Sequence, residues 1–180
     1  MNEFSFFVND NAHKNVSGSL KYFFNGDKPV VLCIGTDAAI GDSLGPIIGT
    51  MLKKSNIDAF VYGSLSTAIT AKEVAKIKSF IKAAHTNSKL LVIDAAIGDS
   101  ADVGKIKITP NSIKPGLGAN KNLPAVGDVT IIGIVAEKSR SNYAFLNLTR
   151  LSPIYNMAEQ IANGIIDYFG TLDKTKYISN

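Results

Sequence analysis

Short apolar runs that alternate with stretches of helical periodicity constrain the fold of this chain more than any other feature of its sequence. The runs VVLCIG and KLLVID are apolar on both faces, a pattern typical of parallel strands that helices cover on either side. The last helical stripe begins where Ser152 can cap a helix and Pro153 can occupy its first turn. The pattern predicts strands over residues 30–35, 58–62, 89–93, 103–109 and 128–135, and helices over about 43–54, 70–84 and 153–169.

The order of these elements is typical of an α/β fold. We expect a three-layer sandwich, with a mostly parallel, twisted sheet of about five strands and helices on both faces. The segment 103–109 alternates apolar residues with lysine, which favours a half-exposed strand at the edge of the sheet. No repeat or linker divides the chain, so we expect one domain: an N-terminal extension over 1–28, a core over 29–170 and a frayed tail over 171–180.

The charge pattern and the single cysteine narrow the function classes. The net charge is +4, but the lysines are scattered and form no dense basic run with interleaved aromatics, so we expect no nucleic-acid partner. Cys33 lies inside an apolar strand, which favours a buried structural thiol over a nucleophile. The chain shows neither a signal peptide nor an apolar run of the roughly 20 residues that span a membrane. We therefore expect a cytoplasmic protein without a membrane partner.

Two aspartates follow predicted buried strands. Asp42 lies in the loop after residues 30–35, and Asp94 comes directly after residues 89–93. In an open α/β sheet such positions lie at the carboxyl edge of the strands, where ligands bind. Each aspartate also has a structural interpretation, because Asp42 can cap the following helix and Asp94 can bond loop amides. If the two carboxylates share one crevice, they suit general acid/base chemistry or, alternatively, a divalent metal.

A loop rich in glycine, asparagine and proline spans residues 115–128. Its glycines allow backbone N–H groups to approach a ligand closely, and Lys121 adds a positive charge. The loop lacks the glycine patterns that bind dinucleotides and nucleotide phosphates, and a plain surface loop is the alternative interpretation. His13 and His85 match neither a catalytic triad nor a zinc site.

Several motifs resemble those of the spore protein family known as YyaC, over about residues 30–170. They are GTDAAIGDSLGP, VYGSL, LLVIDAAIG, PGLGANKNLPAVGD and NLTRLSPIYNMAEQIANGI. That family is similar to the aspartic-type germination protease of spore-forming bacteria and, more distantly, to the hydrogenase maturation endopeptidases. The resemblance implies the phosphorylase/hydrolase-like α/β fold and an activity of peptide-bond hydrolysis.

The same resemblance implies roles for individual residues. Asp42, in Asp-Ser-Leu-Gly-Pro, and Asp94, in Ile-Asp-Ala, match the two catalytic aspartates of the germination protease. The loop motif implies a set of substrate-binding residues: Gly116, Gly118, Asn120 and Lys121. Two features depart from the relatives. No histidine matches the one that helps hydrogenase maturation enzymes bind nickel, and Ala68 and Thr70 stand where YyaC-like chains carry Pro and His.

We therefore expect a spore-associated endopeptidase of the forespore or spore interior that acts on a peptide or protein without a metal or other cofactor. The resemblance implies small acid-soluble spore proteins as its substrates. One alternative is a noncatalytic, protease-like module that binds a peptide or partner. Another is a metal-dependent hydrolase, in which Asp37, Asp99 or Asp128 would join the two aspartates as ligands.

Overall fold

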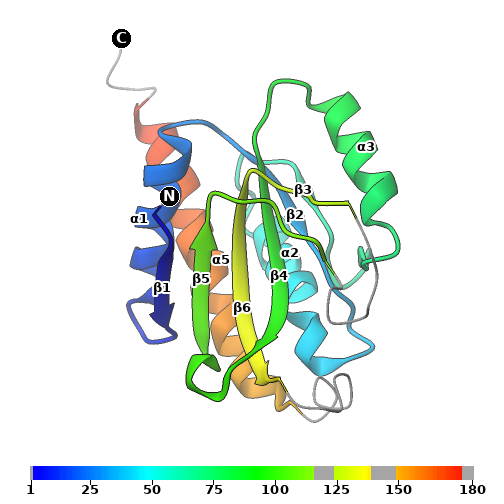
Figure 1. Ribbon diagram of the computed structural model, residues 1–180. Coiled ribbons are helices and arrows are strands. Elements are labelled where there is room, and N and C mark those ends of the chain that lie inside the picture. Colours follow the sequence, from blue (N-terminus) through cyan, green and yellow to red (C-terminus); the bar gives the residue numbers. More distant parts are fainter. Residues whose placement is uncertain (1, 116–123, 139–148, 176–180) are drawn as a thin grey trace.

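The computed structural model describes residues 2–115, 124–138 and 149–175, with side chains through residue 172 (Figure 1). A six-stranded sheet with the strand order β1-β5-β6-β4-β2-β3 forms its centre. The strands are β1 (Phe4–Phe7), β2 (Val30–Cys33), β3 (Val61–Tyr62), β4 (Leu90–Gly98), β5 (Lys105–Thr109) and β6 (Val129–Glu137). The described helices are α1 (Ala12–Phe24), α2 (Leu44–Lys54), α3 (Val74–Ala84) and α5 (Leu151–Thr175), together with the short 3₁₀ helices η1 (Ile40–Ser43) and η2 (Ser100–Asp102).

The sheet is mostly parallel, as predicted. The strands β3, β2, β4 and β6 pair in parallel, whereas β5 is antiparallel to both of its neighbours, β6 and β1. The carboxyl ends of the parallel strands therefore meet at one edge of the sheet, which lies at the bottom of Figure 1. That is the edge at which open α/β sheets bind ligands.

Helices cover both faces of the sheet, which confirms the predicted three-layer α/β architecture. The main core lies under α1, α2 and α5, and its buried side chains include Leu20, Ile48, Ile93, Ile131 and Ile161. On the opposite face α3 packs on β2 and β4 through a smaller core, which includes Val74, Ile81, Leu32 and Val92. Figure 1 shows α3 in front of the sheet and the other helices behind it.

The prediction that residues 103–109 form an edge strand is wrong. Their alternation of buried and half-buried residues is as expected, but β5 lies between β6 and β1. The N-terminal residues cause the difference, because Phe4 pairs with Ile108 and Phe7 with Lys105. The sheet consequently has six strands rather than about five, and residues 1–28 supply one strand and one helix of the domain.

The long C-terminal helix also extends further than expected. Residues 153–169 are helical as predicted, and their apolar stripe is buried against α1 and α2. The helix α5 continues to Thr175, past the predicted start of a frayed tail at residue 171. None of the described helices is long and apolar enough to cross a membrane.

Candidate active site

Asp42 is held at the carboxyl end of β2 by a loop that folds back on itself. The backbone N–H of Thr36 donates a hydrogen bond to the carbonyl oxygen of Asp42 at 3.0 Å. Gly35 has a φ of +140°, and a Cβ atom there would lie 2.1 Å from the same carbonyl oxygen. Only a glycine therefore allows the chain leaving β2 to pass this close to Asp42.

The interpretation of Asp42 as a helix cap is not supported. The residue lies in η1, one position before Ser43, and the first turn of α2 has no side-chain hydrogen bond that caps it. The Oγ of Ser43 donates to the carbonyl of Ile40 instead. The Asp42 carboxyl group is therefore not used to begin α2, and it is half-buried at the sheet edge.

Asp94 lies inside β4, not after its end. The strand continues to Gly98 because β6 supplies partners along this whole length, and Asp94 pairs with Ile132. On its other side, β4 is paired with β2 only as far as Ile93, which lies opposite Cys33. Asp94 is consequently the first residue of β4 beyond the end of β2.

The two carboxyl groups lie close enough to influence each other. The helix η1, which carries Asp42, contacts β4. The pKa of Asp94 is raised to about 8, mainly by burial and secondly by the negative charge of Asp42. A hydrogen bond from the Ala95 N–H at 2.9 Å acts in the opposite direction. Burial raises the pKa of Asp42 to about 6, against a lowering effect of the Thr36 backbone N–H. The structure thus brings together the two aspartates that the sequence singled out.

Different pKa values give the two groups different protonation states. Asp94 has the higher pKa, so its carboxyl group keeps its proton to a higher pH than the Asp42 carboxyl group does. A site that holds one carboxylic acid and one carboxylate can donate a proton to one atom of a substrate and accept a proton from another.

The other acidic residues considered as metal ligands do not assemble around this pair. Asp128 lies at the opposite edge of the sheet, where its Oδ2 accepts a hydrogen bond from the Leu90 N–H at 2.7 Å. Asp37 and Asp99 are exposed. Within the described residues, no group of three or more His, Cys, Asp or Glu side chains is placed to hold a metal ion.

The histidines have structural contacts away from the pair, and the cysteine is a buried core residue. His13, on α1, lies 3.2 Å from Gln160 of α5, and the Nε2 atom of His85 lies 2.8 Å from the Tyr62 hydroxyl. Cys33 is fully buried in β2, and this burial raises the pKa of its thiol to about 12. The interpretation of Cys33 as a buried structural thiol is therefore supported.

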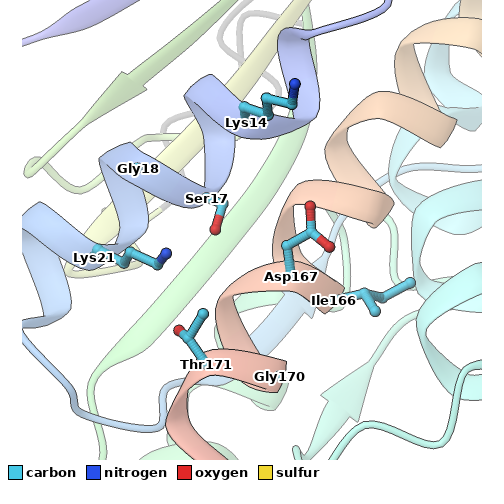
Figure 2. Close-up of a pocket in the computed structure, with 8 residues that line it drawn as sticks. All are labelled: Lys14, Ser17, Gly18, Lys21, Ile166, Asp167, Gly170 and Thr171. Carbon is cyan, nitrogen blue, oxygen red and sulfur yellow. The ribbon is translucent and has the colours of Figure 1, made fainter. Parts of the chain in front are cut away.

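The predicted substrate-binding residues Gly116, Gly118, Asn120 and Lys121 lie outside the described residues, so their role stays a prediction. Two grooves elsewhere have no contribution from either aspartate. One, of about 490 Å³, lies between α1 and α5 with Lys14, Lys21 and Asp167 around it (Figure 2). The other, of about 260 Å³, lies between the start of α5 and the strands beside it.

The sequence does not predict that the backbone beyond Asp94 continues the strand. The predicted strand ends at residue 93, whereas β4 continues to Gly98. The only sequence signal for a longer strand is the small and apolar character of Ala95, Ala96 and Ile97.

Comparisons with known proteins identify relatives of the chain. Residues 4–164 match the family described as "Protein of unknown function (DUF1256)". The chain is 40% identical over 141 residues to the "Uncharacterized protein YyaC" of Bacillus subtilis (strain 168), which covers 78% of this chain and 69% of that protein. The crystal structure of the [NiFe] hydrogenase maturation protease HycI from Thermococcus kodakarensis KOD1 aligns with a TM-score of 0.45 and 19% identity, over 81% of this chain and 97% of that one. The resemblance to YyaC is confirmed, and the chain belongs to the DUF1256 family.

Proposed function

We propose that the protein is an endopeptidase that hydrolyses peptide bonds with the pair Asp42 and Asp94. One observation carries the proposal: two half-buried carboxyl groups from separate segments lie near each other at the carboxyl edge of the sheet, and burial raises the pKa of both, that of Asp94 more than that of Asp42. Acid and base groups of this kind are what the attack of water on an amide requires.

The roles of the two residues follow from their protonation states. The Asp42 carboxylate accepts a proton from a water molecule, whose oxygen forms a bond to the carbonyl carbon of the peptide. The Asp94 carboxylic acid first donates a hydrogen bond to the carbonyl oxygen. Its proton then passes to the leaving nitrogen as the C–N bond breaks. Asp42 afterwards releases its proton to solvent and Asp94 takes one up from solvent, which restores the starting state.

The biological setting rests on the sequence resemblance alone. The aspartates occupy the positions that match the germination protease, and the loop residues Gly116 to Lys121 would then hold the substrate backbone or stabilise the oxyanion. We place the activity in the forespore or spore interior, with small acid-soluble spore proteins as the first substrates to test.

The decisive experiment replaces each aspartate with asparagine, which keeps the shape of the side chain and removes its acid/base function. Asp42→Asn and Asp94→Asn should each lower the rate of cleavage of basic spore proteins by roughly 10²- to 10⁴-fold. Asp37→Asn is the matched control, because this exposed aspartate lies on the same loop as Asp42 and should leave the rate unchanged. Wild-type rates in both site variants would disprove the catalytic roles.

The same assays separate the two alternatives. A protein that binds peptides tightly and cleaves none of them is a noncatalytic module. Cleavage that stops after exhaustive chelation and returns with added divalent metal indicates that the carboxylates act as metal ligands.

A further inference from the structure

The strand β4 is longer than its neighbour β2 at the candidate site. The strand β2 pairs with β4 only from Val30 to Cys33, and the N–H of Ile34 makes the last hydrogen bond, to the carbonyl of Ile93 at 2.8 Å. Beyond this point β4 continues to Gly98 and pairs with β6 alone. Among the described residues, no strand pairs with this side of β4 beyond Ile93, and the helix η1, which carries Asp42, lies nearby. We call this side of β4 the open edge.

The open edge offers backbone hydrogen-bonding groups. Successive residues of a strand direct these groups to opposite neighbours, and the carbonyl of Ile93 points towards β2. Ala95 therefore points to the same side as Ile93. The pairing of β4 with β6 is irregular between Ala96 and Ile97, but the Gly98 carbonyl accepts a hydrogen bond from the Lys138 N–H on the β6 side, so Ile97 points to the same side as Ala95. The N–H of Ala95 bonds to the Oδ1 of Asp94, but the Ala95 carbonyl and both backbone groups of Ile97 have no partner among residues 2–115, 124–138 and 149–175.

The residues that carry these groups are not fully buried. Ala95, Ile97 and Gly98 are half-buried, in contrast to the fully buried residues Leu91 to Ile93 at the start of the same strand. An exposed strand edge with unpaired N–H and C=O groups is a template on which an extended polypeptide can add as a further strand.

We propose that the edge of β4 from Ala95 to Gly98 binds an extended polypeptide segment through main-chain hydrogen bonds. This inference rests on the proposed function, because the bound segment is then the substrate, with its scissile bond beside Asp94. The substrate class is an unstructured stretch of protein, read mainly by its backbone and free of proline at the positions that pair with β4.

The edge is open in one direction only. Ile34 occupies the position beside Ile93, so a bound segment cannot extend from Asp94 towards the start of β4. In the other direction Ile97 lies about 10 Å from Asp94, since a strand rises about 3.3 Å per residue. The residues held by the strand edge therefore lie on a single side of the cleaved bond.

Amide exchange measures this contact directly. We would titrate ¹⁵N-labelled Asp94→Asn protein, which retains the strand edge, with short unstructured synthetic peptides of mixed sequence. Saturating peptide should slow exchange of the Ile97 amide at least tenfold, while the Ala96 amide, which points towards β6, should change little. Absence of binding, or binding that leaves exchange at Ile97 unchanged, overturns the inference.

One substitution in β4 and one modification of the peptide each test the main-chain hydrogen bonds between them. Ile97→Pro removes an N–H that the β4–β6 pairing does not use, so it should weaken peptide binding about 3- to 10-fold, whereas Ile97→Val should not. A second test uses protein with unaltered β4 and peptides that carry one N-methyl group, placed at each residue in turn. Only N-methyl groups on one side of the scissile bond should weaken binding. Equal effects on both sides, or none, contradict the proposal even if Ile97→Pro fails to fold.

The outcomes separate this inference from the proposed function. Cleavage that needs both aspartates, with no protection of Ile97, supports the peptidase and rejects the strand-addition mode. Protection of Ile97 in a protein that cleaves nothing rejects the peptidase and leaves β4 as a peptide-binding edge.

Discussion

The negative charge of Asp42 raises the pKa of Asp94, although the two residues come from separate segments of the chain. Burial is the larger cause, because Asp94 lies within a strand beside a buried core and its charged form is poorly solvated there. Asp42 also has a raised pKa, but it remains the more acidic of the two. The pair therefore loses its first proton mainly from Asp42 and its second mainly from Asp94.

The pH dependence of cleavage should follow this order. Activity should rise as Asp42 ionises near pH 6 and fall as Asp94 loses its proton near pH 8, which gives a bell-shaped profile of kcat/KM with a maximum near pH 7. A profile that rises steadily through pH 9 would show that a protonated Asp94 is not needed.

Asp94→Asn should stabilise the protein at neutral and alkaline pH. A carboxyl group whose pKa is higher in the folded protein than in the unfolded chain costs stability as the pH rises from its ordinary value of 3.8 towards about 8. The neutral amide avoids this cost, so we expect a gain of up to roughly 5 kcal/mol at pH 8, since each pKa unit between 3.8 and about 8 corresponds to about 1.4 kcal/mol. Urea unfolding at pH 4 and pH 8 measures it, and the gain should disappear at pH 4.

Asp102→Asn is the matched control and should have the opposite sign. Hydrogen bonds from Lys105 at 2.7 Å and Lys107 at 2.8 Å lower the pKa of Asp102 to about 2. A depressed pKa contributes stability above the ordinary value of 3.8, and this stability is lost as the pH falls through about 2. The variant should therefore be less stable than the wild type at pH 8, and a gain there would contradict the electrostatic argument.

Two glycines of α5 should respond in opposite ways to the same substitution. A Cβ atom at Gly164 would lie 2.5 Å from the Cβ of Val16 and 2.6 Å from the carbonyl oxygen of His13, so Gly164→Ala must push α1 away. We expect a loss of roughly 1–3 kcal/mol. Gly170→Ala meets no atom within 4 Å and should gain about 0.5–1 kcal/mol from helix propensity. Thermal unfolding of both variants checks the close approach of α1 and α5.

The Cys33 thiol should be inert in the folded protein. It is fully buried and its pKa is raised to about 12, so almost no reactive thiolate exists at neutral pH. A colorimetric thiol reagent should label the native protein only as fast as it unfolds, and rapid labelling without denaturant would contradict this packing.

The fold class and the two acidic positions could be predicted from the sequence because their signals are local. A two-sided apolar run such as that ending at Cys33 indicates a buried strand wherever the strand lies, and an aspartate after such a run is visible without knowing its neighbours. The pairing of Phe4–Phe7 with β5 could not be predicted, because it joins segments far apart in the chain, and so the edge of the sheet was misplaced.

The sequence by itself determined which segments form buried strands and which side chains can donate or accept protons. Only the tertiary structure decided where each strand loses its partner, that Asp94 lies inside β4, and that Asp42 lies near it instead of capping α2. The reason is physical. The apolar pattern of a strand depends on its own residues, whereas the pKa of a carboxyl group and the pairing of a strand edge depend on what the rest of the chain places beside them.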